Sequence, residues 1–434
     1  MNDKGWRLLL GTAFVIQVGL YAWLFDLSND FEYNRPTLGR PVILIFVLFT
    51  ICFALHLLAL IAALRLSSTR SLWWFLFAGA TVFRLVMLPS EPIQEVDIYR
   101  YCWDGHVLRH GISPFRYSPS RALTANENEA GLTQGLRTLI QQRDGDDELE
   151  KLLSRVHFGE LTTIYPPVSQ VVFAVADLLT PAKSTLALRL LIMKFVVVVF
   201  DLLTLAMLAK LLAMLKKHVG WSIVYGWSPL VLKEFANSGH LDSIAVALCV
   251  AAILVATRSF LRSRESVSGA RLRHFRWCNS AGLLALAVGA KLFPIVLAPL
   301  MAAAMWKFHG FRKAIAWSVA FGLTTLAVLS PMLLAMRTDA PDARPLVAAL
   351  AQDAAALQDL NASVPASSLA VPPTPSLTAP SVSDSMNGLG GNLEAATGQP
   401  ESSVSGLEDI DIPETFEPPL PNDDGLIEFL SRWE

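Results

Sequence analysis

The sequence predicts an all-α, polytopic membrane protein, and its composition and hydropathy pattern carry that prediction. Hydrophobic residues make up 53% of the chain and charged residues only 17%, whereas soluble proteins carry roughly 25% charged residues. The apolar residues fall in long blocks, each close to the ~20 residues that a helix needs to cross a bilayer. The blocks lack the alternation of transmembrane strands, so they predict helices. This composition excludes a soluble enzyme, a disulfide scaffold and a nucleic-acid-binding protein.

The apolar blocks predict the membrane-spanning segments in order. The first block is too long for the apolar region of a signal peptide and lacks a small-residue cleavage site. The blocks lie at 6–25, 41–64, 72–88, 186–215, 221–236, 241–257, 281–306 and 314–336. The stretch 89–185 between the third and fourth blocks is a large loop.

Basic residues in short loops predict the orientation of the spans. Clusters occur before the first block, between the second and third, and most densely at 258–276. They fit a cytoplasmic N-terminus and an external loop 89–185. Every cluster becomes cytoplasmic if 166–179 is a juxtamembrane helix rather than a span, and if 281–306 is split at Lys291–Pro294 into two short helices. Lys291 then occupies an external turn.

These segments predict four regions. Residues 1–70 form an N-terminal transmembrane hairpin, and 71–336 form a membrane core that carries the external loop. Residues 337–424 are rich in Pro, Ser, Ala and Gly, which predicts a disordered external linker. Residues 425–434 form a short amphipathic stretch at which the chain stops.

The external loop opens with a helix that carries candidate catalytic groups. Asp97 is the expected N-cap, the helix runs to about His110, and helical spacing places Asp97, Arg100, Tyr101 and Asp104 on one face. The alternative is a solvated helix with an Arg100–Asp104 pair. At the end of the loop, Tyr165 and Gln170 could face a sugar or belong to an interfacial structure.

Further candidates lie at the boundaries of the later blocks. Lys291 interrupts an apolar block, so we expect a bound anion or a carboxylate partner, with a snorkelling lysine as the alternative. His240 and Asp242 lie in a polar break at the external face, which could also be a plain turn. Within a later span, Lys194 and Asp201 are expected to form an ion pair.

The acidic and histidine residues of the loop lack the closed ligand spacing of a structural metal site. The open alternative is a catalytic divalent cation held by Glu95 and Asp97. No cofactor is otherwise indicated, since the chain has neither a GxGxxG nor a GxxxxGK[ST] nucleotide fingerprint.

Several ordered motifs resemble those of the polytopic GT-C glycosyltransferases that use polyprenyl-phosphate sugars. The likeness is to polyprenyl-phosphomannose-dependent mannosyltransferases and covers roughly residues 72–336. It rests on Glu95-Val-Asp97 at the start of the loop, Gly111-Ile-Ser-Pro-Phe115, Tyr165-Pro-Pro167 at its end and Lys291-Leu-Phe-Pro294. The resemblance implies a GT-C-like helical bundle with juxtamembrane helices in its external loop.

The resemblance also implies a function. A polyprenyl-phosphate sugar, with mannose favoured, would be transferred to a lipid or glycan acceptor on the external face, at the inner membrane in a bacterium. Asp97 would be the general base, Glu95 its acidic neighbour, and Lys291 or Arg100 would stabilise the leaving phosphate. The first acidic position is Glu here, and the chain ends where relatives continue, so we expect it to be C-terminally incomplete.

Two other functions remain open from the sequence. Breaks at Pro229 and Pro294 would suit a secondary transporter or a lipid-carrier flippase. The short C-terminus would suit a non-catalytic subunit or an inactive remnant.

Overall fold

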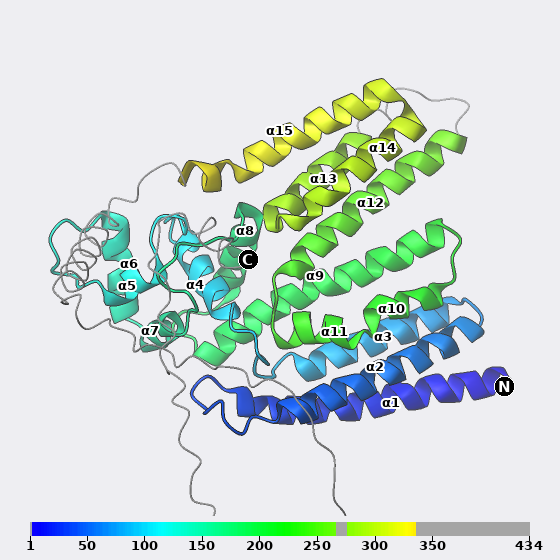
Figure 1. The fold of residues 1–434 in the computed structure, drawn as a ribbon, viewed down its shortest axis with the longest axis horizontal. Coiled ribbons are helices and arrows are strands. Elements are labelled where there is room, and N and C mark those ends of the chain that lie inside the picture. The colour runs from blue at the N-terminus through cyan, green and yellow to red at the C-terminus, as the bar shows by residue number, and fades with distance from the viewer. Residues whose placement is uncertain (1, 266–275, 336–434) are drawn as a thin grey trace, which may run out of the picture. The chain divides into compact units, whose positions relative to one another are not determined.

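The computed structural model describes residues 2–265 and 276–335, which belong to one compact unit. Within these two ranges the chain forms helices and connecting turns, with no strand, as the sequence predicts (Figure 1). The predicted linker 337–424 and the amphipathic stretch 425–434 lie outside the described residues.

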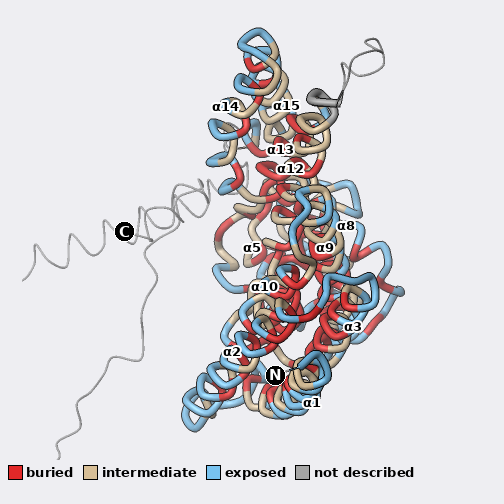
Figure 2. Tube along the Cα trace, turned by 90° about the vertical axis from the view of Figure 1, so that its right-hand side faces the viewer, coloured by how far each residue is buried: buried red, intermediate tan, exposed pale blue. Residues whose placement is uncertain are grey.

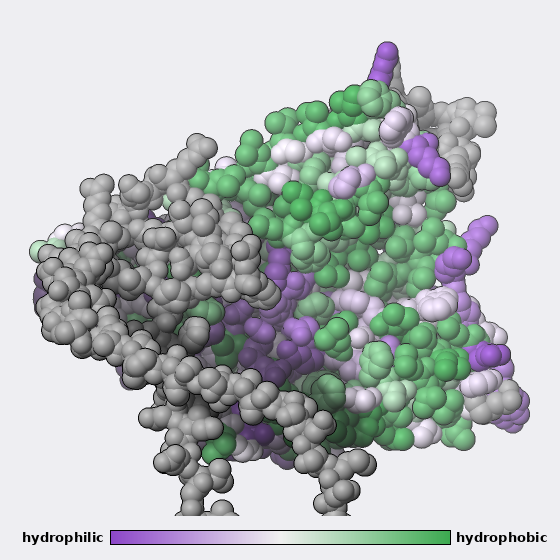
Figure 3. Space-filling view, in the orientation of Figure 1, coloured by the Kyte–Doolittle hydropathy of each residue, from purple (hydrophilic) through white to green (hydrophobic). Residues whose placement is uncertain are grey.

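Five helices are long and apolar enough to cross a membrane, which makes this a membrane-embedded helical protein. They expose many large apolar side chains, and such an extensive apolar surface suits lipid rather than water (Figure 3). Exposed residues follow the outer faces of α1 and α2, while α12 packs closely on its neighbours (Figure 2). The helices are α1 (Asp3–Ser28), α2 (Val42–Arg65), α9 (Leu186–Met214), α12 (Asp242–Glu265) and α15 (Phe311–Ala335).

The predicted span 221–236 is not one continuous helix. It consists of η2 (Val219–Ser222), α10 (Ile223–Gly226), α11 (Pro229–Leu232) and a π-helical turn, η3 (Lys233–Asn237). Proline has no backbone N–H, so the helix restarts at Pro229 instead of continuing. The segment nevertheless runs the length of α3 (Arg70–Met87). Just before the segment, His218 hydrogen-bonds the Leu66 carbonyl, which precedes α3. At the end of the segment, Asn237 accepts from the backbone N–H of Ile93, which follows α3.

The predicted break at Lys291–Pro294 is confirmed. Helix α13 (Arg276–Ala290) ends one residue before Lys291, and η4 (Phe293–Leu297) leads into α14 (Ala298–His309). Lys291 contacts Asp242 at the start of α12, whereas His309 hydrogen-bonds Ser259 near the end of α12, 3.1 Å away. Helices α13 and α14 are therefore two short antiparallel helices, which is the arrangement that brings every basic cluster to the same side of the membrane.

The connections now divide between two ends of the bundle. The end of α1 meets the end of α3, where Ser28 Oγ accepts from Glu91 N–H at 3.0 Å, and the loop 88–185 starts there. The opposite end carries the basic connections around Arg65, Lys216 and Lys307. Hydrophilic side chains gather along the right-hand edge of Figure 3, across the apolar band from the loop. The side of the membrane on which each end lies stays a prediction.

The loop folds into a small helical layer around its first helix, α4 (Ile98–Arg109). Residues on every side of α4 are buried, so the alternative of a solvated helix is wrong. Gly105 lies against the backbone of Phe173 and leaves no room for a Cβ atom. The other helices of the layer are α5 (Pro119–Thr124), α6 (Gln134–Asp144), α7 (Asp147–Ser154) and α8 (Pro167–Leu179). Helix α8 has 13 residues, too short to cross a bilayer.

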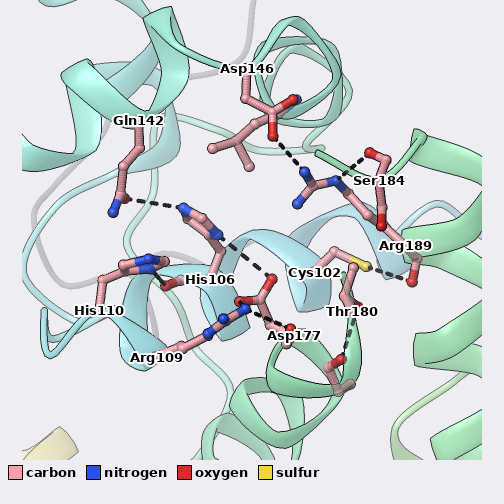
Figure 4. A network of polar contacts seen from close by, with 12 residues as sticks. Cys102, His106, Arg109, His110, Gln142, Asp146, Asp177, Thr180, Ser184 and Arg189 are labelled. Atoms are coloured by element: carbon pink, nitrogen blue, oxygen red, sulfur yellow. Dashed lines mark hydrogen bonds and ion pairs between the residues drawn. The ribbon is translucent and has the colours of Figure 1, made fainter. Parts of the chain in front are cut away.

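A polar network fixes α8 and α6 to α4 (Figure 4). Asp177 of α8 accepts from Arg109 at 3.1 Å and lies 3.6 Å from His106 Nδ1. His106 Nε2 also bonds Gln142 of α6 at 3.1 Å. Burial raises the pKa of Asp177, but His106 and Arg109 outweigh it and leave the pKa below its usual value. The carboxylate is thus a fixed, charged anchor of the layer.

The prediction of an ion pair between Lys194 and Asp201 is wrong. Asp201 instead pairs with Arg84 of α3, through Nε at 2.5 Å and Nη2 at 3.1 Å, and both side chains are fully buried. Lys194 donates to the Ser90 carbonyl. Seven residues along a helix separate two Cα atoms by about 10.5 Å, so the partner from the neighbouring helix is much closer.

Candidate functional site

The site begins in the segment that leads into α4. Gln94 adopts φ 70°, a left-handed conformation uncommon for residues other than glycine and a recurrent feature of functional segments. Glu95 and Asp97 follow, both partly exposed. Asp97 is the N-cap residue, as predicted, but its side chain does not cap the helix. Its carboxylate is therefore available to other partners.

Tyr165 donates a hydrogen bond to Asp97 Oδ2 at 2.7 Å. It precedes Pro166 and Pro167, which fix the backbone at the start of α8. Burial, reinforced by the Asp97 charge, raises the pKa of Tyr165 well above its ordinary value. The phenol therefore stays protonated and acts as a donor toward the carboxylate.

His240 joins the two carboxylates from the connection that precedes α12. Glu95, Asp97 and His240 each offer a ligand atom, and these atoms lie within 4.8 Å of one another. The backbone N–H of His240 donates to the Glu234 carbonyl at 2.8 Å. Gly239 turns the chain at φ 67° beside Ile98, where a Cβ atom would collide. Two carboxylates and an imidazole can hold a divalent cation such as Mn²⁺ or Zn²⁺.

Asp242 connects His240 to Lys291. Its Oδ2 accepts from Lys291 Nζ at 2.7 Å and forms a close contact with His240 Nδ1. The carboxylate partner expected for Lys291 is therefore confirmed, and it comes from the start of α12. The side chains of Lys291 and Asp242 are 34% and 25% exposed, so both remain accessible to a ligand.

We call Glu95, Asp97, Tyr165, His240, Asp242 and Lys291 the accessible cluster. The other predicted substrate-binding residues lie beneath it and are buried. Arg100 donates to the Leu161 carbonyl at 3.1 Å. Gln170 Nε2 donates to Asp104 Oδ2 at 3.0 Å. Burial raises the pKa of Asp104 above its ordinary value, although Arg100 and its hydrogen bonds oppose that change. Contact of these residues with substrate stays a prediction, and their burial favours a supporting role.

Tyr101 supports the site through its ring. It is fully buried, stacks on Phe173 with centroids 4.6 Å apart and meets Tyr165 edge-on at 5.0 Å. These ring contacts hold Tyr165 in place over α4, so the phenol reaches Asp97 from a fixed position.

Two positioning residues escaped the sequence-based prediction. Asn237 accepts from Ile93 N–H at 3.0 Å and donates to the Glu91 carbonyl, so it ties the acidic segment to the break before His240. Asn237 lies in the polar break that the sequence singles out, and that was its only signal. Nothing in the local sequence marks the unusual conformation of Gln94.

The accessible cluster lies where the loop layer meets the apolar bundle. Figure 3 shows hydrophilic side chains gathered near the start of α12 and beside α11, bordered by apolar surface. Six predicted residues come together there: Glu95, Asp97, Tyr165, His240, Asp242 and Lys291. They come from four separate parts of the chain.

No protein-family model matches this chain, and neither does any curated protein or solved structure.

Proposed function

We propose that this protein is an integral-membrane glycosyltransferase. It would move a sugar, with mannose favoured, from a polyprenyl-phosphate donor to a hydroxyl of a lipid or glycan acceptor on the external face. The supporting observation is the accessible cluster itself, in which Asp97, His240, Asp242 and Lys291 adjoin one another at one end of an apolar bundle. The motif resemblance supplies the reaction class.

Asp97 is the best candidate for the general base. A carboxylate that removes the acceptor proton is typically worth 10²–10⁴-fold in rate. The hydrogen bond from Tyr165 fixes one carboxylate oxygen and leaves the other for the acceptor hydroxyl. Glu95 and His240 lie close enough to orient the acceptor or to share the proton.

Lys291 is the best candidate for stabilising the leaving phosphate. An ammonium group near developing negative charge lowers the barrier most where water is excluded. Lys291 lies at the break between α13 and η4, next to the exposed apolar residues Phe293, Ile295 and Val296. This surface could receive the first isoprene units while the ammonium contacts the phosphate. Asp242 keeps the ammonium paired when no donor is bound.

A divalent cation would be held by Glu95, Asp97 and His240. When bound, it would supply additional positive charge for the donor phosphate. The roles of Asp97 and Lys291 described above do not depend on it.

The test is a transfer assay with the full chain in lipid vesicles. The donors are radiolabelled polyprenyl-phosphate mannose and the corresponding glucose and galactose lipids, and the acceptors are a lipid extract and short glycans. Chelator and Mn²⁺ arms report on the cation. We expect label to leave the donor lipid and appear in the acceptor. Movement of intact donor across the vesicle without transfer would instead support a flippase, and no transfer with any pair contradicts the proposal.

A further inference from the structure

A cavity of about 290 Å³ lies beside the acidic segment, outside the cluster described above. Val96 lines it, between Glu95 and Asp97 in the chain. The opposite wall comes from the turn after α7, and Tyr33 reaches it from the connection between α1 and α2. Ser120 and Leu123 of α5 also line it, so four separate parts of the chain build this space, and none of its residues has a role in the proposed transfer.

Arg155 is the main charged group of the cavity and has few protein partners. It is only 8% exposed and lies against the rings of Tyr33 and Tyr99, 4.9 and 5.7 Å from their centroids. Within the described residues its side chain makes one hydrogen bond, to Tyr99 Oη at 3.3 Å, and no ion pair. A guanidinium has five N–H donors, so most of them lack a protein acceptor.

Glu160 carries the matching acceptor. Its Oε1 is buried and has no hydrogen-bond partner among the described residues. Both Glu160 and Arg155 line the cavity, yet they form no ion pair with each other within the described structure. A ligand in the cavity can offer acceptor atoms to the N–H donors of Arg155 and donor groups to the carboxylate of Glu160.

The turn that carries these two residues is firmly held. Arg100 donates to the carbonyls of His157 and Phe158, and Ser120 N–H donates to the Gly159 carbonyl at 2.7 Å. The separation of Arg155 from Glu160 is therefore a property of an anchored turn.

The chemistry of the lining selects the ligand. A simple anion would satisfy Arg155 but be repelled by Glu160, and an apolar ligand would leave both unpaired. A ligand whose hydroxyls both donate and accept satisfies both groups, and aromatic rings such as Tyr33 and Phe158 suit the C–H face of a sugar ring. The volume is near the lower end of the ~300–1,000 Å³ typical of small-molecule sites, which suits one sugar residue.

We propose that this cavity binds one residue of a neutral saccharide, with Arg155 donating to its hydroxyl oxygens and Glu160 accepting from its hydroxyls. This binding site goes beyond the proposed transfer reaction and does not depend on it. Because binding is measured without donor or turnover, its outcome is separate from that of the transfer assay.

The experiment titrates the purified full chain in detergent with methyl α-mannoside, glucose, galactose, N-acetylglucosamine and, separately, inorganic phosphate. Saturation-transfer NMR and calorimetry report binding. The variants are Glu160→Gln and Arg155→Met, with Glu150→Gln and Arg137→Met as matched controls, because those two side chains are exposed and lie outside the cavity.

We expect saturable millimolar binding of at least one sugar, weakened about tenfold by Glu160→Gln, since a hydrogen bond to a charged acceptor is stronger than one to a neutral amide. Arg155→Met should weaken it at least as much, and the control variants should not. If Arg155→Met unfolds, Glu160→Gln decides, because it keeps the shape of the side chain. Absence of sugar binding, binding unaffected by Glu160→Gln, or binding of phosphate alone would overturn the proposal.

Discussion

Tyr165 and Asp97 are 68 positions apart, yet the phenol of the first donates to the carboxylate of the second at 2.7 Å. The contact joins the end of the external loop to its beginning. It also places a neutral donor, rather than a cation, against the candidate base. The geometry around this pair therefore determines where the carboxylate points.

Replacement of Tyr165 by Phe removes only the hydroxyl and should lower the transfer rate about tenfold. The reason is that a hydrogen bond to a charged group is worth roughly 1.5–3 kcal/mol. The measurement is kcat in the vesicle assay. Tyr117→Phe is the matched control, because it removes a tyrosine hydrogen bond to Thr133 elsewhere in the loop layer. Equal losses in both variants would indicate a general effect on folding.

Replacement of Asp97 by Asn should reduce transfer to below about one hundredth, because the amide keeps the shape but cannot accept the acceptor proton. Thermal unfolding in detergent should change little. Asp147→Asn, at an exposed position on α7, is the control and should retain full activity. Retention of more than about a tenth of the rate by Asp97→Asn would rule out its role as general base.

Much of the fold could be predicted because it depends on local pattern. Long apolar blocks fix where spanning helices form, and the basic connections require the break at Lys291, which the structure confirms. The same reasoning distinguishes the short helix α8 from a span. The break in 219–237 was only partly predictable, since Pro229 signals it but the π-helical turn at 233–237 depends on packing.

Partners of single residues were harder to predict. The sequence indicates that Lys291 needs a carboxylate but not that Asp242 supplies it, because the two lie on different helices. The same limitation led to the incorrect pairing of Asp201 with Lys194, whereas packing of α3 against α9 brings Arg84 to it. The saccharide cavity had no sequence signal, since its walls come from segments far apart in the chain.

Replacement of Asp104 by Asn should make stability less dependent on pH, with the variant improving relative to wild type as the pH rises toward neutral. Burial raises the pKa of Asp104 above that of the unfolded chain, so the folded state binds the proton more tightly. The stabilisation that Asp104 contributes by binding this proton is thus fully present below about pH 3.9. It is lost as the pH rises through the higher folded-state pKa. The measurement is the thermal midpoint against pH. The Asn variant should gain over wild type toward neutral pH, and a constant difference at all pH values would contradict this.

Replacement of Arg84 by Met should destabilise the protein by about 3–5 kcal/mol, because it leaves the buried Asp201 carboxylate without its partner. The double variant Arg84→Met/Asp201→Leu should recover much of that loss, since it removes both charges. Unfolding in detergent measures both variants. A double variant less stable than Arg84→Met would show that the pair does more than neutralise charge.

Replacement of Lys291 by Met should raise the donor KM about tenfold or more, because a charge-assisted hydrogen bond to phosphate is lost. The substitution also unpairs Asp242, so a structural defect could imitate this effect. The double variant Lys291→Met/Asp242→Asn separates the two causes, since it removes the unpaired carboxylate while still lacking the cation. We expect the double variant to regain thermal stability but keep the raised KM. Recovery of a normal KM together with stability would mean that Lys291 only holds the start of α12, and that the donor phosphate binds elsewhere.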